Sequence, residues 1–183
     1  MKKITALLAI FALQFPLTAF AERSPLYMNV NAVVFDSTRN TYEPEGVSLG
    51  FGWDLNNYLS FELDGTTSDT YEDQPSADTY QVDYAASAFL RFNLRFNRVT
   101  LYAMGGYSKI KTTSTAGALT TIQESDGTSY GYGIDFYGTP DLALSIRRIE
   151  FIDIDEPAEQ VNIGATMLGI TYYYDTPRIH SRY

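Results

Sequence analysis

The chain has 183 residues, no cysteine and one histidine, His180, so disulfide frameworks and cysteine metal sites are excluded. Its 13 basic and 22 acidic residues give a net charge of −9, which argues against nucleic acid as a partner because phosphate binding needs a basic surface. The length is typical of a single domain.

The first 21 residues have the pattern of an export signal. Lys2 and Lys3 precede an apolar run over 4–15, and Ala19-Phe20-Ala21 supplies a small-x-small cleavage site. The alternative, a membrane anchor, is disfavoured because the run is shorter than the roughly 20 residues that a membrane helix needs. We therefore expect cleavage after Ala21, which removes both lysines and changes the net charge from −9 to −11. The expected division is a signal peptide at 1–21, a barrel at 22–174 and a short periplasmic tail at 175–183.

The rest of the chain alternates apolar and polar residues with a period of two, which is typical of strands. The runs that alternate are 26–36, 46–54, 58–66, 80–93, 98–110, 128–137, 142–153 and 161–174. In the seventh run the phase is lost at Arg147 and Arg148, which predicts a bulge there.

The connections between the runs alternate in length. Short ones lie at 55–57, 94–97 and 138–141, and longer polar ones at 37–45, 67–79, 111–127 and 154–160. Short turns on one side and long loops on the other are typical of membrane barrels, whose closed sheet satisfies every backbone group in lipid. The pattern predicts an all-β fold, an eight-stranded antiparallel up-and-down transmembrane β-barrel.

The two faces of the predicted strands differ in chemistry. One carries glycines and charges of both signs, which suit the narrow lumen of an eight-stranded barrel as a structural polar network. The charged residues of this predicted network are Glu62, Asp64, Asp83, Arg91, Arg98 and Asp135. The other face is rich in aromatic residues, which we expect to contact lipid and to form interfacial girdles. These residues are Trp53, Phe61, Tyr84, Phe92, Tyr107, Tyr130, Tyr132 and Phe136. A soluble barrel with this aromatic face inside is the alternative, but so small a lumen would hold these rings with difficulty.

Three segments resemble the small outer-membrane β-barrel domain family, which includes the OmpA transmembrane domain and OmpX-like "porin family" proteins. Segment 50–63 looks like the strand-turn-strand hairpin of that family, and 131–146 repeats its pattern. Segment 167–174 is similar to the C-terminal β-signal, with Gly169, Tyr172 and Tyr174 at the signal positions, although Met167 stands at the polar position and further residues follow. The resemblance implies export to the outer membrane of a Gram-negative bacterium and recognition of the last strand by the barrel-assembly machinery.

The sequence offers little support for catalysis, a cofactor or a metal site. His180 and Ser181 would lie in the periplasmic tail, at the wrong end for an enzyme that modifies lipids of the outer leaflet. Acidic and hydroxyl residues in the predicted loops lack the spacing of a calcium-binding loop.

We therefore expect a monomeric integral outer-membrane protein with no catalytic, cofactor-binding or metal site. It would contact membrane lipid and lipopolysaccharide, and would have a structural or surface-interaction role with an extracellular ligand bound through its loops. The alternatives are a small-solute channel of low conductance and, less favoured, a lipid A-modifying enzyme.

Overall fold

The computed structural model describes residues 26–37, 43–73, 78–156 and 159–174. The predicted signal peptide at 1–21 and the tail at 175–183 lie outside the described residues. Within the described part of the chain, no helix is long and apolar enough to cross a membrane.

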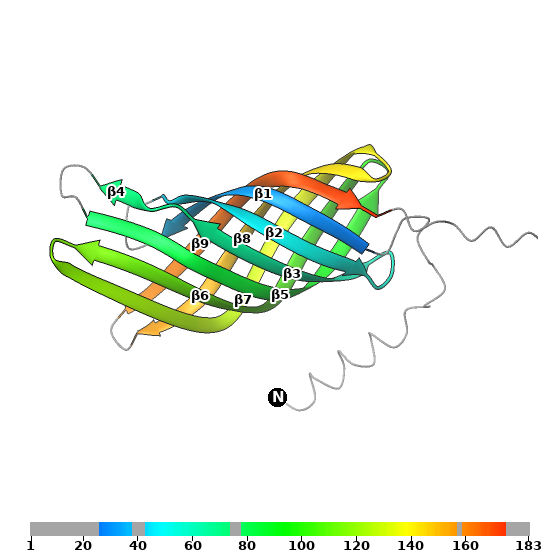
Figure 1. Cartoon of the computed structure of the whole chain (residues 1–183). Helices are drawn as coiled ribbons and strands as arrows, with labels where there is room; N and C mark the ends of the chain where they lie inside the picture. The colour runs from blue at the N-terminus through cyan, green and yellow to red at the C-terminus, as the bar shows by residue number, and fades with distance from the viewer. Residues whose placement is uncertain (1–25, 38–42, 74–77, 157–158, 175–183) are drawn as a thin grey trace, which may run out of the picture.

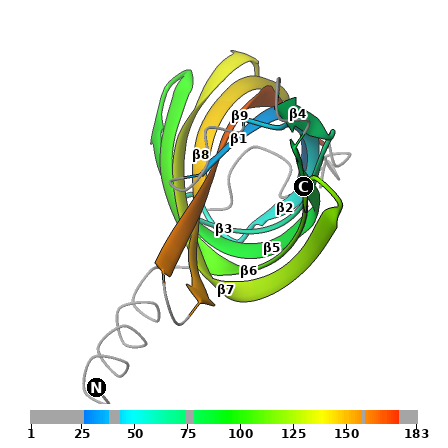
Figure 2. The ribbon, with the colours of Figure 1, turned by 90° about the vertical axis from the view of Figure 1, so that its left-hand side faces the viewer.

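The described residues form one antiparallel sheet that closes on itself (Figures 1 and 2). Its strands are β1 (Leu26–Ser37), β2 (Glu45–Asp54), β3 (Leu59–Ser68), β4 (Tyr71–Asp73), β5 (Asp78–Phe96), β6 (Val99–Ala116), β7 (Leu119–Thr139), β8 (Leu142–Glu156) and β9 (Glu159–Tyr173). Consecutive strands pair with each other except β3 and β4: the short β4 pairs with β5 alone. The eight long strands close into a ring because β3 pairs with β5 and β9 pairs with β1. The prediction of an eight-stranded antiparallel up-and-down barrel is confirmed.

Tight turns connect the strands at one end of the barrel, which we call the turn end. In the β2–β3 turn, the Asn56 side chain accepts hydrogen bonds from the backbone of Tyr58 (2.8 Å) and Leu59 (2.9 Å), an Asx turn. The β5–β6 turn consists of Asn97 and Arg98, and Asn97 has a φ of 44°, which asparagine tolerates better than most residues. The opposite end is the loop end.

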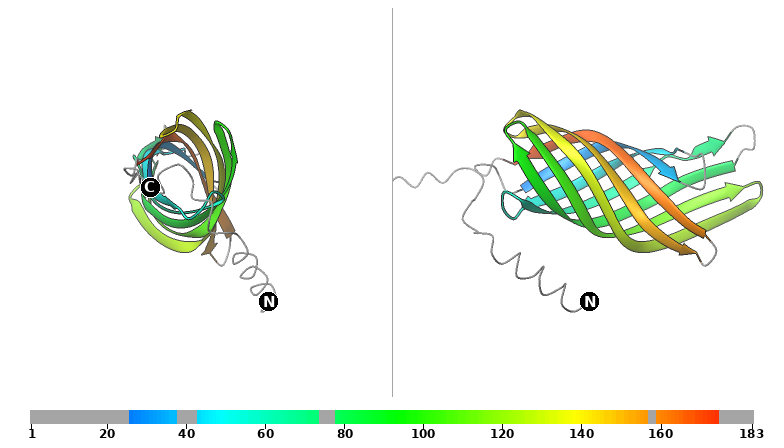
Figure 3. Two further views of the ribbon diagram at one scale, coloured as in Figure 1. Left: turned by 90° about the vertical axis from the view of Figure 1, so that its right-hand side faces the viewer. Right: turned by 180° about the vertical axis from the view of Figure 1, so that it is seen from behind.

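Strands β5, β6 and β7 have 19, 18 and 21 residues, and they continue past their neighbours at the loop end (Figures 1 and 3). The prediction of a loop over 111–127 is therefore wrong. The β6–β7 pairing continues to Ala116↔Leu119, with a turn at Gly117, whose φ is 60°. We call this extension, made of β4 with 78–82, 109–116 and 119–128, the projecting sheet.

The outer surface of the barrel is an apolar belt. On β1, the side chains from Leu26 to Val34 that point outward are apolar, and Asp36 follows them. Nine residues at about 3.3 Å each, tilted by about 40°, cover about 23 Å, close to the roughly 25 Å apolar band of membrane barrels.

The alternation also explains why β8 loses its apolar face at Arg148. Its outward residues are Leu142, Leu144 and Ile146, followed by Arg148 and Glu150, while Ile149 and Phe151 are buried inside. The β7–β8 register is continuous through Arg147 and Arg148, so the predicted bulge is wrong. Instead, the strand passes beyond the apolar belt at this point. Its outward side chains therefore become polar and its inward side chains become apolar.

A real irregularity occurs on β5. The β5–β6 register shifts between Val82 and Tyr84, so Val82 is fully buried inside although it shares the parity of the outward Tyr84. Strict alternation over 80–93 would place Val82 on the same face as Tyr84, but the bulge prevents this, because one extra residue moves the side chains that follow to the other face.

Candidate functional site

The lumen contains a buried ionic cluster centred on Arg147 of β8. Its Nη1 atom donates to Glu62 Oε1, and its Nη2 atom lies 2.6 Å from Asp64 Oδ2, both on β3. Glu62 is 0 % exposed and Arg147 3 % exposed. Strands β3 and β8 lie on different sides of the ring, so the guanidinium joins opposite walls of the lumen.

A second guanidinium, Arg91 of β5, extends the cluster. It donates to Asp135 of β7, lies 3.6 Å from Glu62, and places its carbon 3.5 Å from the centre of the Tyr102 ring. Ser145 donates to the other Asp135 oxygen (2.5 Å). These charges are paired and hydrogen-bonded, as burial away from water requires.

Tyrosines fill the lumen on the turn-end side of this cluster. Tyr27 donates to Glu62 Oε2 (2.8 Å), and its ring lies 5.2 Å from that of Tyr173. Tyr137 and Tyr173 join through their hydroxyl groups (2.9 Å). Gly52 makes this possible, because a Cβ atom there would overlap the Tyr27 ring.

This close approach gives a first prediction. Gly52→Ala is expected to lower the free energy of unfolding by about 1–3 kcal/mol, because the added methyl displaces a buried ring. Gly65→Ala is the matched control, since the nearest atom to its added Cβ is 3.9 Å away. The control should be neutral or slightly stabilising, because glycine weakens a strand. Urea titration of both variants in phospholipid vesicles measures the difference, and equal losses would contradict it.

Apolar side chains fill the lumen on the loop-end side. The cluster draws on five of the eight long strands (β1, β5, β6, β8 and β9) and is made of Val33, Phe35, Val82, Ala85, Phe89, Tyr102, Met104, Ile110, Ile149, Phe151, Ile163, Ala165 and Met167. Along β1 the inward residues therefore change from Tyr27 through Asn29 and Asn31 to Val33 and Phe35. From the turn end onward, the lumen holds tyrosine, ionic and apolar layers. A continuous aqueous path would have to displace all three.

The structure brings together four of the six charged residues expected in the lumen. Glu62, Asp64, Arg91 and Asp135 lie in the ionic cluster. Asp83 does not join them: at the β5 bulge it is half-buried, 3.7 Å from Lys111, and it accepts a hydrogen bond from Thr113 (2.9 Å).

Arg98 also lies elsewhere, exposed in the β5–β6 turn, which corrects the expectation that it faces the lumen. Alternation along the strand assigned Arg98 to the polar face. Alternation does not apply to Arg98, however, because this residue lies in the turn and not in the strand. Sequence reasoning missed Arg147 as a lumen residue. The signal was present, because Arg147 lies two residues after Ser145 and therefore on the same inward face of β8.

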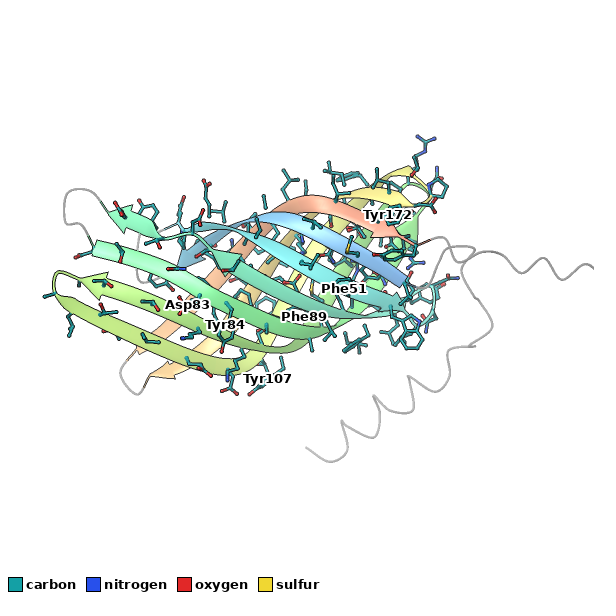
Figure 4. All side chains as sticks on the ribbon, in the orientation of Figure 1. Phe51, Asp83, Tyr84, Phe89, Tyr107 and Tyr172 are labelled. Atoms are coloured by element: carbon teal, nitrogen blue, oxygen red, sulfur yellow. The ribbon has the colours of Figure 1, made fainter. Side chains whose placement is uncertain are left out.

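The eight aromatic residues expected to contact lipid are all exposed on the outer surface. Trp53 and Phe136 lie near the turn end. Tyr107, labelled on the outer surface in Figure 4, is one outward position from the charged Lys109 of β6. Tyr130 is two outward positions from the charged Asp126 of β7. Of the β-signal residues, Tyr172 and Tyr174 are outward with ring centres 5.5 Å apart, and Gly169 lies beside Asn31.

A charged clamp crosses the outer surface directly above the apolar belt. Arg148 of β8 donates to both Asp36 oxygens on β1 (2.9 and 2.8 Å), and also to Thr166 (2.9 Å) of β9. It passes over Gly164, where a side chain would collide with it. The hydrogen bonds to Asp36 and Glu150 raise the pKa of Arg148 above its usual value. The clamp therefore fastens the first and last strands at the edge of the belt.

Within the described residues, no group of three histidine, cysteine or acidic side chains is arranged to hold a metal ion. The arrangement offers instead a filled, rigid cylinder and a polar sheet that projects from one end.

A closed antiparallel sheet with an apolar exterior and a buried ionic cluster in its lumen defines a membrane-spanning β-barrel. The comparisons specify the class further: residues 4–175 match the family described as "Outer membrane protein beta-barrel domain", and the chain belongs to that family.

Solved structures with the same fold include two bacterial proteins. Ail, the attachment invasion locus protein of Yersinia pestis, is 17% identical, and the match covers 83% of this chain and 99% of that chain with a TM-score of 0.62. A second structure of Ail, in complex with the heparin analogue sucrose octasulfate, matches with a TM-score of 0.59 and with the same identity and coverage. Neisserial surface protein A is 18% identical over 84% of this chain and 100% of that chain, with a TM-score of 0.63. No curated protein matches the sequence.

Proposed function

We propose that this protein is an anchored binding module of the Gram-negative outer membrane, whose loop end faces the outside of the cell. The projecting sheet carries the proposal. It continues β5, β6 and β7 past the apolar belt as regular hydrogen-bonded structure, with polar residues on its outward face. A rigid platform held away from the membrane is suited to contact with another molecule.

The proposed role is non-catalytic, and the proposed unit is a monomer surrounded by lipid and lipopolysaccharide. The three filled layers of the lumen support anchoring over the alternative of a small-solute channel. The export signal expected at 1–21 would direct the chain out of the cytoplasm. Tyr172 of β9 and Tyr174, which follows the strand, are exposed on the outer surface and would be accessible to the assembly machinery.

The ligand class is expected to differ from that in the Ail complex. Ail was crystallised with a sulfated heparin analogue, a polyanion. This chain carries a net charge of −9, and the outward acids Glu124 and Asp126 of β7 are exposed on its projecting sheet. Binding of polyanions is therefore not expected of this chain.

A deletion designed from the register tests the proposal. Lys111 pairs with Glu124, so replacing 112–123 with Asn-Gly removes the tip of the projecting sheet and closes the hairpin with a two-residue turn. Cells that display the protein should adhere to immobilised host or bacterial surface polymers, and the deletion should reduce adhesion toward that of cells without the protein.

The control is a two-residue Gly-Ser insertion between Asn97 and Arg98, at the turn end. Heat-modifiable migration verifies that each variant is folded. The proposal fails if folded wild-type protein at the cell surface gives no adhesion above background, or if the deletion and the insertion behave alike.

A further inference from the structure

The seam between β1 and β9 closes the ring, and no turn fixes its register. β1 and β9 are the first and last strands of the described sheet, so the chain between them runs through every other strand (Figure 1). In a hairpin, the length and type of the turn limit which residues can pair. At the seam, the pairing runs from Tyr27↔Tyr173 to Ser37↔Ile163 without that constraint.

Alternation of apolar and polar residues does not select this register by itself. A shift of two residues keeps every outward side chain on the outward face, because the side-chain period of a strand is two. One such shift would place Val30 opposite Tyr172 and Ala32 opposite Ile170, again apolar beside apolar. Lipid would accommodate both registers, so the selection must come from contacts that a shift of two residues breaks.

Two adjacent arginines of β8 make such contacts, one on each face of β9. Arg147 points into the lumen, donates to Met167 Sδ of β9 (3.2 Å) and reaches Asn29 Oδ1 of β1 (3.1 Å). Arg148 points outward and donates to both carboxylate oxygens of Asp36 on β1 (2.9 and 2.8 Å). Strand β8 therefore holds β1 from inside and from outside the barrel wall, although β9 lies between them.

The outer contact depends on the register of the seam. The Arg148 side chain passes over Gly164, which is the residue of β9 that pairs with Asp36. A Cβ atom at Gly164 would overlap the guanidinium, so the contact needs a glycine at this position. A shift of two residues would move Asp36 by about 6.6 Å along the strand, beyond hydrogen-bond reach of Arg148.

The inner contact depends on the same register. Asn31 lies against Gly169, where a Cβ atom would overlap the Asn31 amide. The Asn31 amide donates to Asn29 Oδ1 (2.9 Å), the same oxygen that accepts from the lumen guanidinium. A shift of two residues would bring Asn31 opposite Met167 or Thr171, whose side chains would occupy the space that the glycine leaves.

We propose that Arg147 and Arg148 select the register in which β1 closes against β9. The two arginines form a bracket around β9, with Asn29 as the inner partner on β1 and Asp36 as the outer partner. Because the stagger of a closed sheet is linked to its tilt and diameter, the bracket also sets the dimensions of this barrel. This inference concerns barrel closure and does not depend on the ligand of the loop end.

The test removes the two β1 partners in steps. The double variant D36N/R148M removes the outer contact and leaves the lumen unchanged. The triple variant N29A/D36N/R148M also removes the inner acceptor, while Arg147 keeps its carboxylate partners. Each protein is refolded from urea into phospholipid nanodiscs, and heat-modifiable migration verifies that it is folded.

NMR contacts between backbone protons of β1 and β9 report the register directly. The wild-type protein should show one set, with Asn31 beside Gly169. The triple variant should show a second set, with Asn31 beside Thr171 or Met167, and the fraction of molecules in that register should rise at least about tenfold over the wild type.

The matched control is D83N/K111M. It removes another ion pair at the loop end, between β5 and β6, whose two-residue turn limits their register independently. Both double variants should lose little stability, but only D36N/R148M and the triple variant should change the register of the seam.

A single native set of contacts in the folded triple variant would overturn the inference, because the arginines would then stabilise the seam without selecting its register. An equal second set in D83N/K111M would overturn it as well. If the triple variant does not fold, D36N/R148M decides by the same readout: a second set supports the inference, and a single native set overturns it.

Discussion

Replacing Arg147 with methionine is expected to lower the free energy of unfolding by about 3–5 kcal/mol, the largest loss that we predict for this protein. The substitution keeps an unbranched side chain of similar length but leaves the buried carboxylates of Glu62 and Asp64 without their main cationic partner. Urea titration in phospholipid vesicles, followed by heat-modifiable migration, measures the change.

The neighbouring Arg148 is the matched control. Its guanidinium also contacts carboxylates, but it lies on the outer surface and its partner Asp36 is about half exposed. Arg148→Met should therefore lower stability by only about 1 kcal/mol or less. Adding E62Q/D64N to R147M should restore part of the loss, because neutral amides are less costly to bury than charges. Equal losses at 147 and 148 would show that the ionic cluster does not hold the lumen together.

The second large effect concerns the outer surface. Val30→Arg is expected to lower the free energy of unfolding by about 2–4 kcal/mol, because Val30 lies in the middle of the β1 apolar run and a cation there would enter hydrocarbon. Ile122→Arg provides the comparison. Ile122 is at least as exposed as Val30 but lies beyond the belt, so this change should stay within about 0.5 kcal/mol.

The same titration in vesicles measures both variants. In a water-soluble barrel the two exposed positions would respond alike. Similar values for Val30→Arg and Ile122→Arg would therefore contradict the assignment of the outer surface to lipid.

The fold was predictable from sequence because a period of two is a local property of each strand. Alternation places Leu26 to Val34 and Leu142 to Ile146 on one face without knowledge of their neighbours. Glycines and charges on the other face then indicate a narrow polar lumen.

The errors occur where the alternation of apolar and polar residues no longer reports a lipid-facing side and a lumen-facing side. On β8, Arg148 and Ile149 look like a loss of phase, but the strand is regular and the surroundings change from lipid to water. The hydroxyl-rich segment 111–127 resembles a loop because it lacks apolar alternation, yet its two halves pair with each other from Lys111↔Glu124 to Ala116↔Leu119. Such pairing leaves little trace in residue type when neither face is covered by lipid or core.

The composition of the ionic cluster was only partly predictable. Glu62, Asp64, Arg91 and Asp135 could be assigned to the lumen by parity, but their partners depend on the order of strands around the ring and on their tilt. Arg147 was missed because it stands next to another arginine at a position where the strand seemed irregular.

The projecting sheet also has a consequence for biogenesis. Lys109, Lys111, Glu124 and Asp126 lie beyond the belt, on the side of the bilayer opposite to the turn end. Each of these charged side chains must therefore cross the hydrocarbon interior before the barrel closes. Pure lipid imposes a large free-energy cost on that step. The rate of insertion of this chain should accordingly be limited by translocation of its hairpins rather than by hydrogen bonding between its strands. A locally thinned bilayer should increase that rate.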